Sequence, residues 1–110
     1  DEGSHTRSFC YVSDMVEGLY RLLLSDKVMP VNLGNPREIS ILGLAQLVLC
    51  ISGSDSEISF VEPQDARTKD DPQTRRPDIT KAHTLLDWEP RVSLEEGLAK
   101  TIDWYRERIC

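Results

Sequence analysis

Two adjacent arginines, Arg75 and Arg76, stand just before a residue suited to begin a helix. Asp78 is a good N-cap residue because its carboxylate can accept hydrogen bonds from the free backbone N–H groups of a first turn. That helix end already carries a partial positive charge, so helix stability does not explain two more cations beside it. Two guanidinium groups beside exposed N–H donors form a receptor for a doubly charged anion such as a phosphate. The sequence leaves a second interpretation equally open, in which both arginines only pair with the carboxylates of Asp70, Asp71 and Asp78.

Candidates for a catalytic site are few. His5 and His83 are the only histidines, and the carboxylates fall mostly at capping or solvent-exposed positions, which argues against a Ser-His-Asp triad and against a glycosidase-like carboxylate pair. The six glycines do not form the G-x-G-x-x-G or P-loop spacing of a nucleotide-binding motif.

The cysteines are odd in number, widely spaced and without metal-ligand spacing: Cys10, Cys50 and Cys110. They predict neither a disulfide framework nor a zinc site, and they fit a reducing compartment, so we expect a cytoplasmic location.

Length and charge narrow the class of protein. The 110 residues are enough for one domain, and we expect no second domain in the chain. Thirteen Lys and Arg against nineteen Asp and Glu give a net charge of −6, and the basic residues do not line one helix face. This balance argues against a nucleic-acid partner. The apolar runs are far shorter than the roughly 20 residues that span a bilayer, so we expect no membrane segment.

Capping residues and hydrophobic spacing predict four helices. The pair Asp14 and Glu17 forms a capping box for the first helix, which should end near Leu24 and bury an apolar stripe: Val16, Leu19, Tyr20 and Leu23. The second helix follows Ser40 as its N-cap and ends at Gly53. Its apolar residues cover most of its circumference, so it needs cover on several sides.

The remaining pattern adds two helices and three strands. One helix should begin at about Ile79, and a capping box of Ser93 and Glu96 should start the last one. Three short runs predict strands: residues 8–12, 28–33 and 57–61. Strands that alternate with helices indicate an α/β fold, but three short strands are too few for a sheet covered on both faces. The chain therefore looks like part of a larger α/β unit.

Four segments carry a resemblance to a known family. They are Gly3 to Asp14, Asn32 to Pro36, Asp70 to Ala82 and Leu86 to Pro90, and in this order they span nearly the whole chain. The sequence resembles the C-terminal part of the extended short-chain dehydrogenase/reductases that act on nucleotide sugars, and within them the UDP-glucuronate decarboxylase (UDP-xylose synthase) group most. UDP-sugar 4-epimerases and dTDP-glucose 4,6-dehydratases are the nearest alternatives. A different class of answer is a standalone, non-catalytic module that closes its apolar faces by self-association.

The resemblance implies a fold and a set of binding residues. The fold would be the α/β substrate-binding portion of an NAD(P)-binding Rossmann-like enzyme, without its N-terminal Rossmann half. Arg7 matches the family arginine that grips the diphosphate of the UDP-sugar, and Arg75 matches an arginine in the substrate pocket of the decarboxylating members. Asn32 matches a position close to the nucleotide sugar, although a turn-forming role at a strand end explains it equally well. The expected partners are a UDP-sugar such as UDP-glucuronate or UDP-xylose, the missing Rossmann portion, and further copies of the chain in a homo-oligomer.

The resemblance also implies what this chain leaves to the rest of the enzyme. In the full-length parent, NAD would oxidise the sugar at C4, the β-keto acid would lose CO2, and NADH would return the hydride. The cofactor glycines and the Tyr-x-x-x-Lys pair of the family lie in its Rossmann part. No tyrosine here has a lysine four residues later, because those positions are Met15, Leu24 and Ile109. We therefore expect no catalytic residue and no bound NAD in this chain alone.

Overall fold

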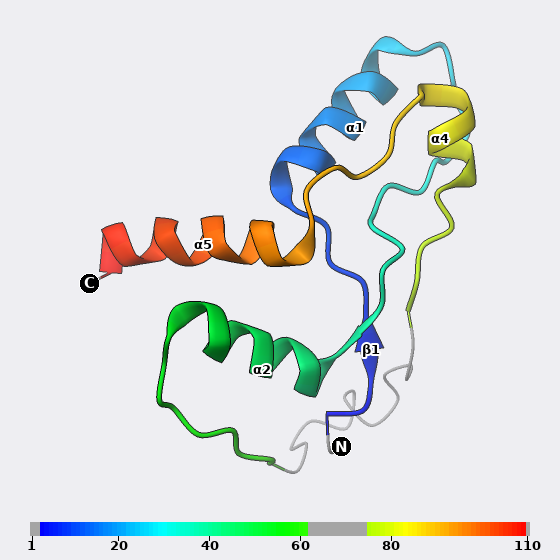
Figure 1. Ribbon diagram of the computed structural model, residues 1–110. Helices are drawn as coiled ribbons and strands as arrows, with labels where there is room; N and C mark the ends of the chain where they lie inside the picture. The colour runs from blue at the N-terminus through cyan, green and yellow to red at the C-terminus, as the bar shows by residue number, and fades with distance from the viewer. Residues whose placement is uncertain (1–2, 62–74, 110) are drawn as a thin grey trace.

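The computed structural model describes residues 3–61 and 75–109. Figure 1 shows an open arrangement in which two helices lie together at one end and two others lie side by side below them. In chain order the elements are β1 (Thr6–Arg7), α1 (Val12–Leu24), β2 (Ile39–Ser40), α2 (Ile41–Ser52), α4 (Thr80–Leu86) and α5 (Leu94–Ile109).

The two strands form a short antiparallel pair near the N-terminus. Thr6 lies opposite Ser40 and Arg7 lies opposite Ile39. The pairing continues beyond the strands, because the amide of Leu42 donates to the carbonyl of Gly3 at 3.0 Å. This pair fixes the start of α2 against the segment that carries Arg7.

The buried core lies between α1, α4 and the loop that follows α4. Among the described residues, the buried hydrophobic side chains are Ala82, Leu86 and Trp88, and Trp88 is 2% exposed. The indole Nε1–H of Trp88 donates to the backbone carbonyl of Asp14 at 2.9 Å. The carboxylate of Asp14 accepts from the amides of Arg91 at 3.1 Å and Val92 at 3.0 Å. The loop after α4 is therefore attached to α1 by buried hydrogen bonds as well as by packing.

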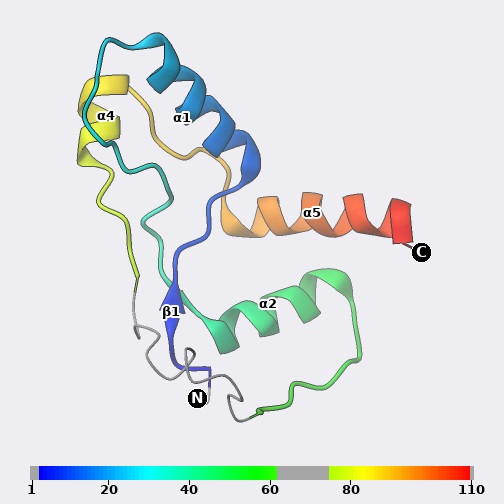
Figure 2. The same ribbon diagram turned by 180° about the vertical axis from the view of Figure 1, so that it is seen from behind.

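The other pair of helices, α2 and α5, lies side by side in both views (Figures 1 and 2). The guanidinium of Arg106 on α5 donates to the carbonyl of Ser52 at the end of α2. At the other end of α5, Arg37 forms a two-pronged ion pair with Glu95, with N–O distances of 2.6 and 2.7 Å. Hydrogen bonds from Arg37 lower the pKa of the Glu95 carboxyl to about 2.

Several predicted helix ends are confirmed. The Ser40 hydroxyl accepts from the amide of Gly43 at 2.9 Å, and Gly53 has a left-handed φ of 69° after the last turn of α2. The Ser93 hydroxyl accepts from the amide of Glu96 at 3.1 Å before α5. The confirmed ends depend on neighbours along the chain, which is why the sequence predicts them. Asp78 as the N-cap of α4 is wrong: α4 begins at Thr80 with Ile79 as its N-cap residue, and the Asp78 carboxylate instead accepts from the amide and hydroxyl of Thr80.

The three predicted strands are wrong. Residues 8–11, 28–33 and 57–61 form no strand, and the strands among the described residues are the two-residue β1 and β2. A strand needs a partner along its edge, and the described residues offer none to the segment at 28–33, where Val28 is 97% exposed. Beta-type residues alone therefore do not make a strand here.

The prediction for α1 is also wrong at two points. The helix begins at Val12 after Tyr11, so Asp14 lies inside the first turn and is buried rather than acting as the N-cap. The predicted stripe of Val16, Leu19, Tyr20 and Leu23 is exposed. The face that packs inward carries Asp14 and Gly18 instead.

Candidate functional site

The three residues predicted to bind substrate line one cavity of about 810 Å³. Arg7 comes from β1, Asn32 from the extended segment before β2, and Arg75 from the segment that leads into α4. Apart from Met15 on α1, the remaining lining residues are neighbours of these three along the chain: Ser8, Phe9, Cys10, Leu33, Gly34, Arg76 and Pro77. The structure thus brings together side chains that stand up to 68 positions apart, from Arg7 to Arg75.

Arg7 is held by the strand pair. Its position opposite Ile39 fixes its backbone, and its guanidinium Nη1 donates to the carbonyl of Thr6 at 2.7 Å. The side chain is half-buried and lines the cavity. The bond to Thr6 uses one of the five N–H donors of the guanidinium, which leaves the others for a ligand. A planar guanidinium in this setting suits a phosphate or carboxylate ligand.

Arg75 and Arg76 are exposed and approach the cavity from the opposite segment. Within residues 3–61 and 75–109, no acidic side chain forms an ion pair with either arginine. Of the three carboxylates weighed as their partners, Asp70 and Asp71 lie outside the described residues. The third, Asp78, is already occupied by Thr80, whose hydroxyl and amide hydrogen bonds lower the pKa of the Asp78 carboxyl, with a smaller effect from the charge of Arg76.

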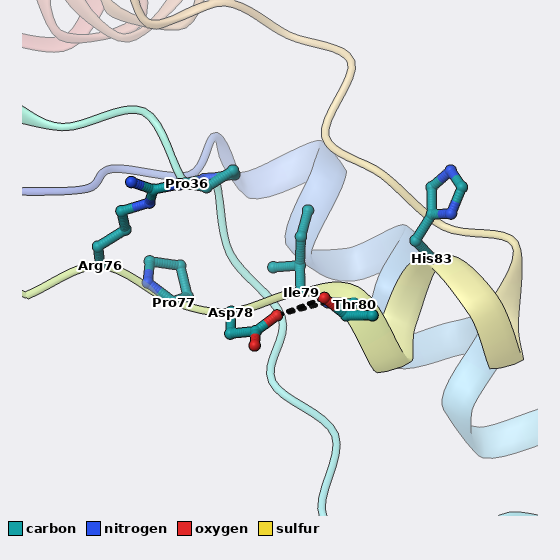
Figure 3. Close-up of a pocket in the computed structure, with 7 residues that line it drawn as sticks. All are labelled: Pro36, Arg76, Pro77, Asp78, Ile79, Thr80 and His83. Carbon is teal, nitrogen blue, oxygen red and sulfur yellow. Dashed lines mark hydrogen bonds between the residues drawn. The ribbon is translucent and has the colours of Figure 1, made fainter.

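A second cavity, of about 600 Å³, is lined in part by the same segment and is drawn in Figure 3. Arg76 and Pro77 line both cavities. The second one adds Pro36, Asp78, Ile79, Thr80 and His83, with the His83 ring projecting from α4 (Figure 3). The sequence offered Arg76, with Arg75, as one possible anion receptor, but the family resemblance did not include it among the binding residues. Its adjacency to Arg75 was the available signal.

Among its described lining residues, the cavity at Arg7 has one thiol, Cys10, and no acid–base pair. Burial, and then the charge of Asp14, raise the pKa of the Cys10 thiol, so Cys10 stays protonated near neutral pH. No group of three or more His, Cys, Asp or Glu within the described part of the chain is arranged to hold a metal ion. The arrangement can bind and orient an anion through three guanidinium groups.

Family membership is decided by a match over most of the chain. The family model described as GDP-mannose 4,6 dehydratase matches residues 1–101. The chain belongs to this family. Its members include extended short-chain dehydrogenase/reductases, so the resemblance predicted from four sequence segments is confirmed.

Curated relatives of known name are about half identical to the chain. UDP-glucuronic acid decarboxylase 1 of Xenopus tropicalis is 52% identical over 107 residues, which are 97% of this chain and 24% of that protein. UDP-glucuronic acid decarboxylase 6 of Arabidopsis thaliana is 50% identical over 107 residues, again 97% of this chain and 30% of the relative. The chain thus spans 24–30% of the length of these relatives.

Solved structures of the family share the fold. The UDP-glucose 4-epimerase of Thermotoga maritima, solved with UDP-glucose, superimposes with a TM-score of 0.91 at 32% identity, covering 100% of this chain and 34% of that one. The UDP-glucuronic acid 4-epimerase of Bacillus cereus, solved with UDP-glucuronic acid and NAD, gives a TM-score of 0.82 at 30% identity, covering 96% and 33%. These matches confirm the predicted fold class, part of an NAD-binding α/β enzyme of the Rossmann-like type. Among the described residues, the strands of this chain are the two-residue β1 and β2.

Proposed function

We propose that this chain is the C-terminal, nucleotide-sugar-binding portion of an NAD-dependent UDP-glucuronate decarboxylase, which converts UDP-glucuronate to UDP-xylose and CO2. The observation that carries the proposal is the cavity that gathers Arg7, Asn32 and Arg75. Relatives named for this activity are 50–52% identical to the chain, whereas the two solved epimerases are 30–32% identical. Both comparisons favour decarboxylation over epimerisation as the activity of the parent enzyme.

In this proposal the residues of the chain bind and orient the substrate. Arg7 and Arg75 approach the cavity from opposite segments, so together they can hold the two phosphates of a UDP-sugar between them. Asn32 lines the same cavity; its Nδ2 donates one hydrogen bond to the carbonyl of Asp78, which leaves its second N–H and its side-chain oxygen for the sugar or the nucleotide. The residues present do not fit NAD, because the chain has neither the glycine motif nor the Tyr-x-x-x-Lys pair. The chemical step belongs to the rest of the enzyme.

We further propose that the remainder of the enzyme covers the exposed apolar side of α1. Val16, Leu19 and Leu23 are exposed there, and Leu23 is 79% exposed. Such a continuous apolar surface favours burial by another polypeptide. The alternative of a self-associating module is favoured by the same surface, and association of the 110 residues alone would bury it.

No helix of the described residues is long and apolar enough to cross a membrane. The cytoplasmic location stays a prediction from the cysteines.

Titration of the native enzyme with UDP and with NAD tests the binding role. Arg7→Ala and Arg75→Ala should each remove a charge-assisted hydrogen bond worth roughly 1.5 to 3 kcal/mol, which weakens UDP binding on the order of tenfold to a hundredfold. NAD affinity should hardly change. Arg91→Ala is the matched control, because Arg91 lines neither the cavity of Arg7 and Arg75 nor the second cavity, which shares Arg76 with it.

Two results would contradict the proposal. UDP affinities of the Arg7 and Arg75 variants equal to that of the parent would show that the cavity does not bind the diphosphate. A native enzyme that releases no CO2 from UDP-glucuronate, while it interconverts UDP-sugars, would instead favour the epimerase alternative.

A further inference from the structure

Gly34 lies at a close contact between two of the segments that line the cavity, the one that carries Asn32 and the one that carries Arg75. The residue is buried, and a Cβ atom added to it would stand 2.9 Å from the Cγ atom of Pro77 and 3.4 Å from its Cβ atom. The φ angle of Gly34 is not positive; the glycines with positive φ are Gly3 and Gly53. Backbone conformation therefore does not require glycine at position 34, and the close approach of Pro77 does.

Two hydrogen bonds hold the same arginine-bearing segment on either side of this contact. The Ser8 hydroxyl donates to the carbonyl of Arg75 at 3.3 Å, and the Asn32 amide donates to the carbonyl of Asp78 at 3.4 Å. Both distances are longer than those of strong hydrogen bonds, so these contacts tolerate movement. The packing of Pro77 directly on the Gly34 backbone is stiffer, because overlap of atoms rises steeply at short distance.

We propose that Gly34 is a positioning residue, which sets the separation of Arg75 and Arg76 from the segment that carries Asn32 and, through the β1–β2 pairing, from Arg7. This inference rests on the proposed function, in which those cations hold a diphosphate. Charge-assisted N–H···O bonds have a narrow optimum near 2.7–2.9 Å, so a small outward shift of the segment at 75–78 loosens the grip on both phosphates. The glycine thus acts through the arginines and does not touch the ligand.

The substitution Gly34→Ala in the native enzyme tests the role, with UDP as the probe. The added methyl group must push Pro77 away, and we expect UDP affinity to fall about tenfold, the loss of one charge-assisted contact. Gly53→Ala is the control, because it strains a left-handed residue remote from the cavity and has open space around it. It should lower the unfolding midpoint without changing UDP affinity.

A rescue variant and a ligand-free measurement make the test specific. Pro77→Ala removes the Cγ atom that the new methyl group would meet, so combining it with Gly34→Ala should restore UDP affinity to that of Pro77→Ala alone. Hydrogen exchange of the amides at 78–80 should become faster in Gly34→Ala and stay unchanged in Gly53→Ala.

The outcomes separate this inference from the proposed function. Unchanged exchange in Gly34→Ala, or faster exchange with unchanged UDP affinity, overturns the positioning role. An unsubstituted enzyme that fails to bind UDP overturns the proposed function, and the exchange measurement then still decides whether Gly34 holds the arginine segment.

Discussion

The two sides of α1 differ in a way that hydrophobicity alone does not suggest. Its inner side packs on the Trp88 loop with a buried carboxylate, Asp14, and a glycine, Gly18, whose added Cβ atom would lie 3.1 Å from the Trp88 ring. Its outer side carries the branched and aromatic residues, and they face solvent. Small and polar groups let the backbone of α1 approach the tryptophan and the loop closely. In the proposed function, this apolar stripe packs against the remainder of the enzyme.

Substitutions at the inner side of α1 should lower the unfolding free energy most, and Trp88→Ala is the strongest test of this. Trp88 is 2% exposed, and its replacement by alanine removes both its packing and the hydrogen bond from its indole to the carbonyl of Asp14. Truncating a buried tryptophan costs about 3–5 kcal/mol of unfolding free energy, which urea denaturation measures. Trp104→Ala is the matched control, because Trp104 is 50% exposed on α5. Equal losses in the two variants would remove the contrast between the inner side and the surface.

A smaller loss is expected when the buried carboxylate of Asp14 is changed. Asp14→Asn leaves one carbonyl oxygen where two oxygens accept from the amides of Arg91 and Val92, and it turns an NH2 group toward one of these donors. An unpaired buried donor costs about 1–3 kcal/mol, so the unfolding midpoint in urea should fall accordingly. The same change at Asp26, an exposed carboxylate, should have no measurable effect. A stable Asp14→Asn variant would show that the loop does not depend on these bonds.

The smallest stability effect should come from the outer side, where the change appears in association instead. We expect the 110 residues expressed alone to oligomerise or to bind hydrophobic dyes, since open apolar surface costs about 25 cal/mol per Å². Val16→Ser with Leu23→Ser should reduce this association in light scattering over a dilution series, with little change in unfolding free energy. Leu22 packs against the buried cluster of Ala82, Leu86 and Trp88. Leu22→Ser should therefore lower the unfolding free energy without reducing association. A compact, dye-negative monomer of the unsubstituted chain would contradict the expectation.

Local features of the fold could be predicted from the sequence because their partners are neighbours along the chain. The hydroxyls of Ser40 and Ser93 and the left-handed Gly53 act within four residues, so helix ends there followed from residue type. The basic pair of Arg75 and Arg76 before α4 could be recognised for the same reason, because the two residues are adjacent in the sequence. The family resemblance also followed from the sequence, because its four motif segments are each made of residues that follow one another along the chain.

Only the tertiary structure decided which faces are buried and which distant residues meet. The spacing of Val16, Leu19 and Leu23 shows that α1 has an apolar side, but spacing cannot say whether the covering surface belongs to this chain. Likewise, residues 28–33 have strand-forming types and no strand, because a strand exists only when another chain segment supplies its hydrogen bonds. The meeting of Arg7, Asn32 and Arg75 in one cavity depends on the β1–β2 pairing and on the contact between Gly34 and Pro77. Both are contacts between segments distant in sequence, which residue order leaves unspecified and packing settles.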